Sequence, residues 1–195
     1  KRPDALDPKS IRYRFRKKRI QHVERLLDQI LAEKPVAKVL DIGGRRDYWQ
    51  LLDARFANRI ELTILNTEDE VALEDLGNDI GITVETVVGD GCNMPQYGDG
   101  AFDLSHSNSV IEHVGLFSNM IRFAGETRRV GRAYYLQTPN FWFPLEPHYG
   151  VPFFHWLPET MRVGLHTSFN IGYAQKAPYQ QAMTRVDHTR IINRR

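Results

Sequence analysis

Five short segments of strand character, alternating with stretches of helical character, constrain the fold of this chain more than any other feature. In the intervening stretches apolar residues recur every three or four positions, which is the spacing of an amphipathic helix. Strands are therefore predicted over residues 36–42, 60–65, 83–88, 102–107 and 133–137. Helices are predicted over residues 20–32, 48–57, 71–78 and 110–130, with Gly131 at the end of the last one. Strands that alternate with helices form a parallel sheet through right-handed crossovers, with helices on both faces.

The length of 195 residues suits one domain with its own core. We expect that domain to span residues 20–195, after a basic N-terminal arm over residues 1–19. The chain is 42% hydrophobic and 26% charged, which excludes a disordered or membrane-spanning class. Its single cysteine, Cys92, excludes an internal disulfide framework and a cysteine-rich zinc site. A cytoplasmic location is expected, with peripheral contact to a membrane as an open alternative.

The N-terminal arm carries nine basic residues and two acidic ones, although the whole chain has a formal net charge of only +2. Such a segment can bind nucleic acid, an anionic membrane surface or a phosphorylated substrate. The interpretation we favour is the first part of a helix with its charges in solvent, because most charge runs are solvated faces. Nucleic acid is not an expected partner, since the chain shows no RNP-type, zinc-knuckle or helix-turn-helix pattern.

Glycine and polar residues gather where the predicted strands end. They are Asp41-Ile42-Gly43-Gly44, Asn66, Gly89-Asp90-Gly91 and Ser107-Asn108-Ser109. Ligands of open parallel sheets bind beyond the carboxyl ends of the strands, so these residues predict a binding site there. Taken singly, each also fits an ordinary strand-end turn, a helix cap or an Asx turn.

Three of these segments together resemble motifs of the class I S-adenosylmethionine-dependent methyltransferases. Val39–Gly44 looks like the family's first motif, and Gly89–Gly91 looks like the acidic segment after its third strand. Phe102–Leu104, followed by Ser109–Val114, looks like the fourth-strand motif of members that act on small molecules and lipids. The resemblance covers residues 36–138. It implies a Rossmann-like α/β fold, the cofactor S-adenosyl-L-methionine and methyl transfer as the activity.

The resemblance also implies roles for residues at the strand ends. Gly43 and Gly44 would cradle the methionine part of the cofactor, since glycine lets a backbone approach a ligand closely. Asp41 would orient this turn or meet the cofactor's ammonium group. Ser107 and Asn108 would flank the methionine moiety.

Further residues would bind the adenosine part of the cofactor. Asp90, beside Gly91, would accept a hydrogen bond from the adenine amino group, with help from the backbone of Cys92 or Asn93. Asn66 would take the ribose hydroxyls.

Two departures from the family pattern are visible. Arg45 and Arg46 stand where the family has later glycines, and they either crowd the cofactor or point toward a substrate anion. Asn66 stands where the family prefers an acidic residue, a role that Glu68 could take over.

Residues 139–158 combine five prolines with seven aromatic residues. The prolines exclude a regular helix or central strand, and the aromatic residues argue against a fully solvated loop. We interpret the segment as a substrate-binding wall or lid; a loop packed against the core and an interfacial membrane contact are the alternatives. The expected substrate-binding residues are Arg45, Trp142, Glu146, His148, Tyr149 and His155.

An oxygen acceptor needs a base to take its proton, and histidine titrates near neutral pH. His148, which Glu146 could pair with, is favoured as the catalytic base over His113, and His155 is a further candidate. A metal site formed by Glu146, His148 and His155 matches no strong ligand spacing, so no metal is predicted.

The expected function is methyl transfer from S-adenosyl-L-methionine to a small or lipid- or glycan-linked acceptor, most simply on oxygen. A nucleic-acid methyltransferase and a non-catalytic methyltransferase-like binding protein remain alternatives. A dinucleotide oxidoreductase is excluded, because the chain lacks G-x-G-x-x-G after its first strand. No run after Val163 is long enough for the family's C-terminal strand hairpin. Either the hairpin is missing or the chain continues past Arg195.

Overall fold

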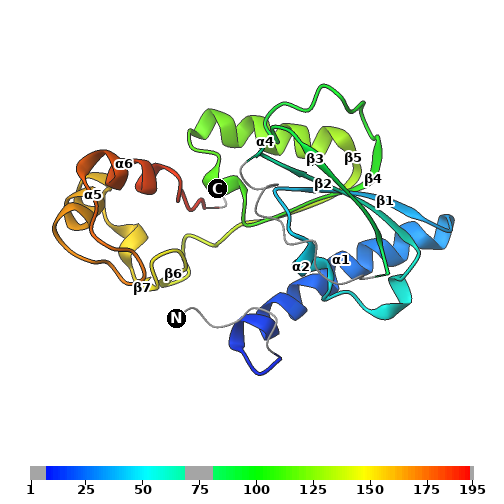
Figure 1. Ribbon diagram of the computed structural model, residues 1–195, viewed down its shortest axis with the longest axis horizontal. Coiled ribbons are helices and arrows are strands. Elements are labelled where there is room, and N and C mark those ends of the chain that lie inside the picture. The colour runs from blue at the N-terminus through cyan, green and yellow to red at the C-terminus, as the bar shows by residue number, and fades with distance from the viewer. Residues whose placement is uncertain (1–7, 69–80, 194–195) are drawn as a thin grey trace. The chain divides into compact units, whose positions relative to one another are not determined.

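The structure contains a five-stranded sheet with the strand order β3-β2-β1-β4-β5 (Figure 1). It is a computed structural model, and it describes residues 8–68 and 81–193. The strands are β1 (Ala37–Ile42), β2 (Ile60–Asn66), β3 (Thr83–Val88), β4 (Phe102–Asn108) and β5 (Gly131–Gln137). Strand β1 pairs in parallel with β2 and with β4, and β2 pairs in parallel with β3. The predicted Rossmann-like parallel sheet is confirmed, with strand boundaries within two residues of the prediction.

The contacts within the chain divide it into two compact units. The first unit comprises Lys1–Asn108 and Ala124–Leu136, and the second comprises Ser109–Phe123 and Gln137–Arg195. The single domain expected over residues 20–195 was therefore too coarse a description. The chain leaves the sheet after β4 and again after β5, and the residues that follow these two strands make most of their contacts with one another.

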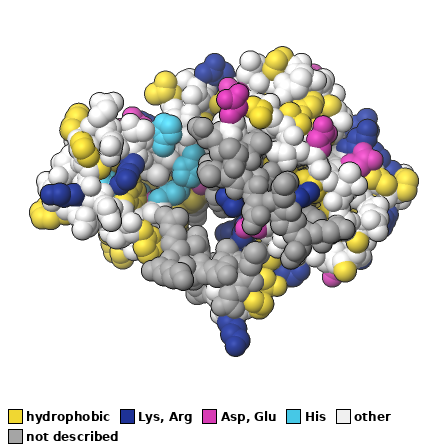
Figure 2. Space-filling view, in the orientation of Figure 1, with side chains coloured by type: hydrophobic (Ala, Val, Ile, Leu, Met, Phe, Trp, Pro, Cys, Tyr) yellow, Lys and Arg dark blue, Asp and Glu magenta, His cyan; other side chains and the backbone are white. Residues whose placement is uncertain are grey.

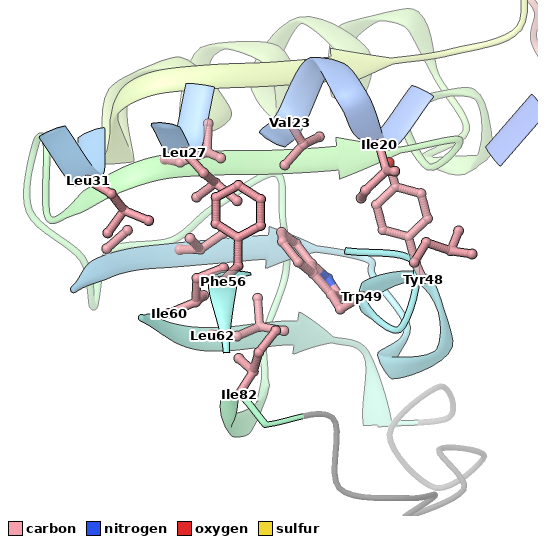
Figure 3. Close-up of a cluster of buried hydrophobic side chains, with 14 of the residues drawn as sticks. Ile20, Val23, Leu27, Leu31, Tyr48, Trp49, Phe56, Ile60, Leu62 and Ile82 are labelled. Atoms are coloured by element: carbon pink, nitrogen blue, oxygen red, sulfur yellow. The ribbon is translucent and has the colours of Figure 1, made fainter. Parts of the chain in front are cut away.

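Helix α1 (Ile11–Glu33) covers one face of the sheet in the first unit. Its buried positions are one helical turn apart, as an amphipathic helix requires. Figure 3 shows these side chains meeting residues of the strands and of the segment after β1; they are Ile20, Val23, Leu27 and Leu31. The aromatic residues of this core, Trp49 and Phe56, are almost completely buried.

The favoured interpretation of the basic arm as the first part of a helix is confirmed from residue 11 onward, because α1 begins at Ile11. The hydroxyl of Ser10 accepts a hydrogen bond from the Tyr13 amide and caps the helix. Two of the basic side chains contact the body of the unit. Arg16 lies 3.3 Å from the Asp47 carboxylate, and the Lys17 ammonium donates to the Leu51 carbonyl at 2.6 Å.

The helix expected over residues 48–57 was also wrong. The structure has a short helix α2 (Arg46–Trp49) and a 3₁₀ turn η1 (Ala54–Phe56). The break follows from Trp49, whose indole is drawn toward the sheet by a hydrogen bond to Asp41. The helix expected over residues 71–78 lies outside the described residues.

The helix expected over residues 110–130 is a 3₁₀ turn η2 (Ile111–His113) followed by α4 (Phe117–Val130). Its C-terminal half belongs to the first unit, where Figure 1 shows it on the face opposite α1. The Ser105 hydroxyl donates to the Thr127 carbonyl at 2.5 Å and ties this half to β4. As predicted, the helix ends at Gly131, where an added Cβ would meet the backbone of Ser105 at 2.7 Å.

The second unit is built from short elements. These are β6 (Leu145–Glu146), β7 (Val151–Pro152), η3 (Phe154–Trp156), α5 (Glu159–Ser168) and α6 (Tyr179–Asp187). Strands β6 and β7 pair antiparallel, and α5 packs against α6 through Val163, Ala182 and Val186. In the part of the chain that the structure describes, no strand follows β7, and no helix has the length and apolarity needed to cross a membrane.

Candidate functional site

Asp41, one residue before the end of β1, organises the carboxyl edge of the sheet. It is completely buried, and both of its carboxylate oxygens accept hydrogen bonds. The indole Nε1 of Trp49 donates to Oδ2 at 2.7 Å, and Nδ1 of His106 donates to Oδ1 at 2.6 Å. Of the two roles considered for Asp41, the geometry therefore supports orientation of the turn, because the side chain is completely buried and both oxygens already bind protein donors.

His106 lies beside Asp41 in the neighbouring strand β4 and completes this buried pair. Its ring stacks on Tyr135 at 5.5 Å and on Tyr48 at 5.1 Å, and it meets the edge of Trp49 at 5.2 Å. The hydrogen bond to a carboxylate fixes the proton on Nδ1. Burial raises the pKa of the Tyr48 hydroxyl above its usual range, so the tyrosine stays neutral.

The turn after β1 depends on two glycines. Gly43 has a φ of 72°, in the left-handed region that favours glycine. At Gly44 an added Cβ would come within 1.7 Å of the Asp41 carboxylate, so no side chain fits there. The side-chain amide of Asn66, at the end of β2, donates to the Gly44 carbonyl at 2.8 Å and holds the turn from the other side.

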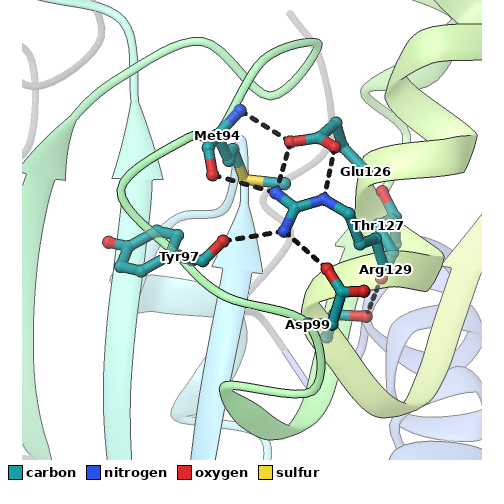
Figure 4. A network of polar contacts seen from close by, with 7 residues as sticks. Met94, Tyr97, Asp99, Glu126, Thr127 and Arg129 are labelled. Atoms are coloured by element: carbon teal, nitrogen blue, oxygen red, sulfur yellow. Dashed lines mark hydrogen bonds and ion pairs between the residues drawn. The ribbon is translucent and has the colours of Figure 1, made fainter.

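The loop after β3 carries Asp90, whose Oδ1 accepts a hydrogen bond from the amide of Cys92 at 2.8 Å. Asp90 is exposed, and the loop beyond it is tied to α4 by Arg129 (Figure 4). The Arg129 guanidinium donates to the carbonyl oxygens of Met94 and Tyr97 and pairs with Glu126 at 2.7 Å. These bonds hold the pKa of Glu126 below its usual value. Asp90 is thus presented on a fixed loop.

Ser107 and Asn108 end β4, and the structure gives them different environments. The Ser107 hydroxyl is buried and donates to the Ile42 carbonyl at 2.9 Å, so it joins β4 to β1. The Asn108 side-chain oxygen is buried and has no hydrogen-bond partner among residues 8–68 and 81–193. A buried acceptor without a partner is costly, and it marks a place where a donor from a ligand can bind.

Comparison with known proteins identifies the sheet and its carboxyl edge. A family model described as a methyltransferase domain matches residues 40–133, which run from within β1 to the start of β5. Residues 40–133 form a class I S-adenosylmethionine-dependent methyltransferase domain. Its cofactor is S-adenosyl-L-methionine.

Individual proteins that resemble this chain match different shares of it. Uncharacterized proteins from two strains of Mycobacterium tuberculosis are 37% identical over 65 residues, which is 33% of this chain and 22% of theirs. The PH0226 protein of Pyrococcus horikoshii is 24% identical, with a TM-score of 0.42, over 67% of this chain and 58% of that chain. A putative methyltransferase of Bacillus halodurans is 22% identical, with a TM-score of 0.41, over 82% and 65%. The chain spans about a fifth of the length of the curated relatives it matches.

The methyltransferase domain offers hydrogen-bond acceptors and open backbone that fit this cofactor. The unpartnered Asn108 oxygen suits the ammonium group of the methionine moiety, because that group is a hydrogen-bond donor. The Gly43–Gly44 turn presents backbone without side chains, and Asp90 offers an exposed carboxylate. Asn66 is buried and holds Gly44, and Cys92 holds Asp90, so these two residues act on the turn and the loop.

The second unit contains the predicted pair of Glu146 and His148. Nδ1 of His148 donates to Glu146 Oε1 at 2.5 Å, while the other oxygen of Glu146 accepts from the Tyr149 amide at 2.6 Å. Glu146 is almost completely buried, and it sits in the first strand of the β6–β7 hairpin. A carboxylate on Nδ1 fixes the histidine tautomer, as it does in acid–base pairs of hydrolytic enzymes.

His113 lies against His148, with ring centroids 4.9 Å apart. Its Nδ1 donates to the His188 carbonyl at 2.5 Å. Histidine side chains gather at the surface of the face shown in Figure 2 (cyan). The structure thus brings together, in the second unit, the two histidines that the sequence singled out as candidate bases.

Glu112 is the residue of this cluster that the sequence analysis missed. Glu112 lies within the motif over Ser109–Val114, but the sequence assigned it no role; its side chain is completely buried. Burial raises the pKa of its carboxyl, and the Thr138 hydroxyl donates to one of its oxygens at 3.0 Å.

The other expected substrate residues do not form one group. Trp142 is exposed, and its indole donates to Asn193 at 3.0 Å. His155 is buried and donates from Nε2 to the Phe141 carbonyl at 2.7 Å, which is a structural contact. Arg45 belongs to the first unit, is exposed, and lies 3.7 Å from the Asp47 carboxylate.

The aromatic segment surrounds a pocket of about 380 Å³ in the second unit. Its lining is mainly apolar and includes Val151, Phe153, Phe154, Leu157, Leu165 and Ile171. Other aromatic side chains of the segment are exposed to solvent, namely Trp142, Phe143, Phe153 and Trp156. An apolar pocket of this size accepts a ligand of modest size or the apolar part of a larger one.

Proposed function

We propose that the whole chain transfers a methyl group from S-adenosyl-L-methionine to an oxygen atom of a small or lipid- or glycan-linked acceptor. The observation that supports an amphiphilic acceptor is the aromatic segment over residues 139–158. It combines the apolar pocket with aromatic side chains exposed to solvent. Exposed apolar residues in such number usually mark a binding surface.

In this proposal the first unit binds the cofactor. Gly43 and Gly44 approach the methionine end, Asn108 accepts from its ammonium group, and Asp90 accepts from the adenine amino group. Asp41 is a positioning residue, since its two oxygens hold Trp49 and His106. When bound, the cofactor supplies an electrophilic methyl group.

The second unit supplies the acceptor side of the reaction. His148 is the favoured proton acceptor, because Glu146 holds its Nδ1 and so makes Nε2 the basic nitrogen. His113 is the neighbouring ring that supports it.

Two measurements test the proposal. Calorimetric titration with S-adenosyl-L-methionine and with its demethylated product should show micromolar binding that Asp90→Ala and Asn108→Ala weaken, with NAD as the control ligand. Transfer of a radiolabelled methyl group should then be followed into organic-soluble, water-soluble and nucleic-acid fractions of a cell extract. Label in the organic or small-molecule fraction supports the proposal.

The same measurements distinguish the alternatives. Label in nucleic acid that disappears at high salt would replace the proposal with a nucleic-acid methyltransferase. Failure to bind the cofactor would favour a non-catalytic binding protein. His148→Gln should retain cofactor binding and lose methyl transfer; unchanged transfer would overturn the role of His148.

A further inference from the structure

Three side chains of the second unit converge in a way that the methyl-transfer chemistry alone does not require. Glu112, His113 and His148 each offer one ligand atom, and these atoms all lie within 4.8 Å of one another. Two of the residues are adjacent in the turn η2, and the third lies in the loop between β6 and β7. We propose that Glu112, His113 and His148 form a binding site for one divalent transition-metal cation. This inference goes beyond the proposed function and does not depend on the acceptor; the cation and the acceptor's proton would compete for Nε2 of His148, because Nδ1 is bound to Glu146.

Each of the two histidines donates a hydrogen bond from its Nδ1, as a metal-ligating histidine does from the ring nitrogen that does not bind the metal. Nδ1 of His113 donates to the His188 carbonyl, and Nδ1 of His148 donates to the Glu146 carboxylate, each at 2.5 Å. In metal sites the second ring nitrogen of a ligating histidine almost always donates to a carbonyl or a carboxylate, which fixes the ring and its tautomer. Both kinds of partner occur here, and they make Nε2 the ligand nitrogen of each ring.

Glu112 supplies an independent observation that points to a cation. Its side chain is completely buried; Oε2 accepts from Thr138, whereas Oε1 has no hydrogen-bond partner in the part of the chain that the structure describes. A buried carboxylate without a full set of partners is strongly disfavoured when charged, which agrees with the raised pKa of Glu112. A cation bound at Oε1 would remove that penalty.

The distances are compatible with a shared cation. Carboxylate and imidazole ligands lie about 2.0–2.2 Å from a zinc-like ion, so two ligand atoms at the tetrahedral angle are about 3.4 Å apart. The three ligand atoms lie within 4.8 Å of one another, so cation binding requires each side chain to move inward by at most about 1 Å. His113 is exposed and His148 is partly exposed, so a cation can enter from solvent.

The ligand set selects the class of cation. Two imidazole nitrogens and one carboxylate oxygen suit zinc, iron(II), manganese(II) or cobalt(II). Magnesium and calcium prefer oxygen ligands, so they should bind more weakly here. The three side chains leave further coordination positions to water or a ligand, as in catalytic rather than structural metal sites.

The test uses the whole chain after removal of metal with a chelator. Calorimetric titration with Zn²⁺ and with Co²⁺ should show one cation per chain, and bound Co²⁺ should give a visible absorption spectrum with nitrogen ligands. Glu112→Gln and His148→Gln should each weaken binding at least 10-fold. Glu146→Gln should weaken cation binding 10–100-fold, because Glu146 holds the His148 ring through its Nδ1. His22→Gln, at an exposed histidine of the first unit, is the matched control and should bind normally.

Circular dichroism and cofactor binding should be measured on every variant. If a variant keeps its fold and still binds S-adenosyl-L-methionine, loss of Co²⁺ absorption reports on the metal site alone. Equal cation affinity in the wild type, Glu112→Gln and His148→Gln would overturn the inference, as would the absence of any binding. Because cation binding is measured without an acceptor, the inference can succeed while the proposed acceptor is wrong, and the reverse.

Discussion

The carboxylate of Asp41 lies 2.6 Å from Nδ1 of His106, and neither side chain is exposed to solvent. This pair joins the two central strands of the sheet directly beneath the turn that we assign to the cofactor. The rings of Tyr48, Trp49 and Tyr135 pack around His106 and keep water away from the pair. The turn is therefore positioned by this buried polar contact as well as by its two glycines.

Removal of one partner of this pair should lower the stability of the fold strongly. Asp41→Ala leaves the buried donors of Trp49 and His106 without acceptors, and we expect it to lower the free energy of unfolding by about 3–5 kcal/mol. Urea denaturation at neutral pH measures this loss. Asp28→Ala, at an exposed ion pair with Arg55, is the control and should change stability by less than about 0.5 kcal/mol. Equal effects of the two substitutions would show that the buried pair is unimportant.

Gly44→Ala tests the close approach of the turn to Asp41. The new methyl group would overlap the fixed Asp41 carboxylate, so either the turn or the carboxylate must move. We expect a loss of about 1–3 kcal/mol in stability and at least 10-fold weaker binding of S-adenosyl-L-methionine. At Gly98 an added Cβ would have no atom within 4 Å, so Gly98→Ala should alter neither quantity. Normal cofactor binding by Gly44→Ala would refute the assigned turn.

The Glu126–Arg129 pair should make stability depend on acid pH. Hydrogen bonds from Arg129 are the main cause that holds the pKa of Glu126 below the usual 4.5. The stabilisation is therefore complete above about pH 4.5 and is lost as the pH falls through the lower pKa of the folded state. Glu126→Gln should cost on the order of 1 kcal/mol at pH 7, after allowance for partial exposure. Urea midpoints of the variant and the wild type should converge as the pH is lowered from 4.5; a constant difference would contradict this.

His166 should give a second, separate pH effect. Burial is the main cause that lowers its pKa below 6.5, and the charge of Arg185 adds to it. The unfolded chain binds a proton at this residue more readily than the folded chain, so stability is complete above about pH 6.5 and falls as the pH decreases below it. His166→Leu should flatten the urea midpoint between pH 6.5 and 5, measured on the whole chain. His22→Leu, at an exposed histidine, should retain the slope of the wild type.

The sheet could be predicted from the sequence because its strands are continuous apolar runs that end at glycine or polar residues. Helix α1 was predicted from its buried face, but its start was not. Residues 11–19 are too basic to look amphipathic, and contacts to Asp47 and Leu51 hold the side chains of Arg16 and Lys17. The helix expected over residues 48–57 failed for a tertiary reason, since the bond from Trp49 to Asp41 overrides local propensity.

The sequence could indicate contacts between residues that are close along the chain. It could not indicate contacts between residues that only the folding of distant segments brings together. Glu146 and His148 are two residues apart, so their contact was foreseeable. His106 meets Asp41 only because β4 pairs with β1, and Glu112 meets His148 only because two distant segments fold together. A polar residue inside an otherwise buried central strand was the available signal for His106, since such a residue must have a partner.

The three tryptophans divide between the two units in a useful way. Trp49 is buried in the first unit, at the turn assigned to the cofactor, whereas Trp142 and Trp156 are 59% and 42% exposed in the second unit. Light emitted by Trp49 comes from an environment that water and ionic quenchers do not reach, and the emission of the other two comes from the surface. The native chain therefore carries an internal optical reporter for each unit, and ligand binding or unfolding in one can be followed without attaching a dye.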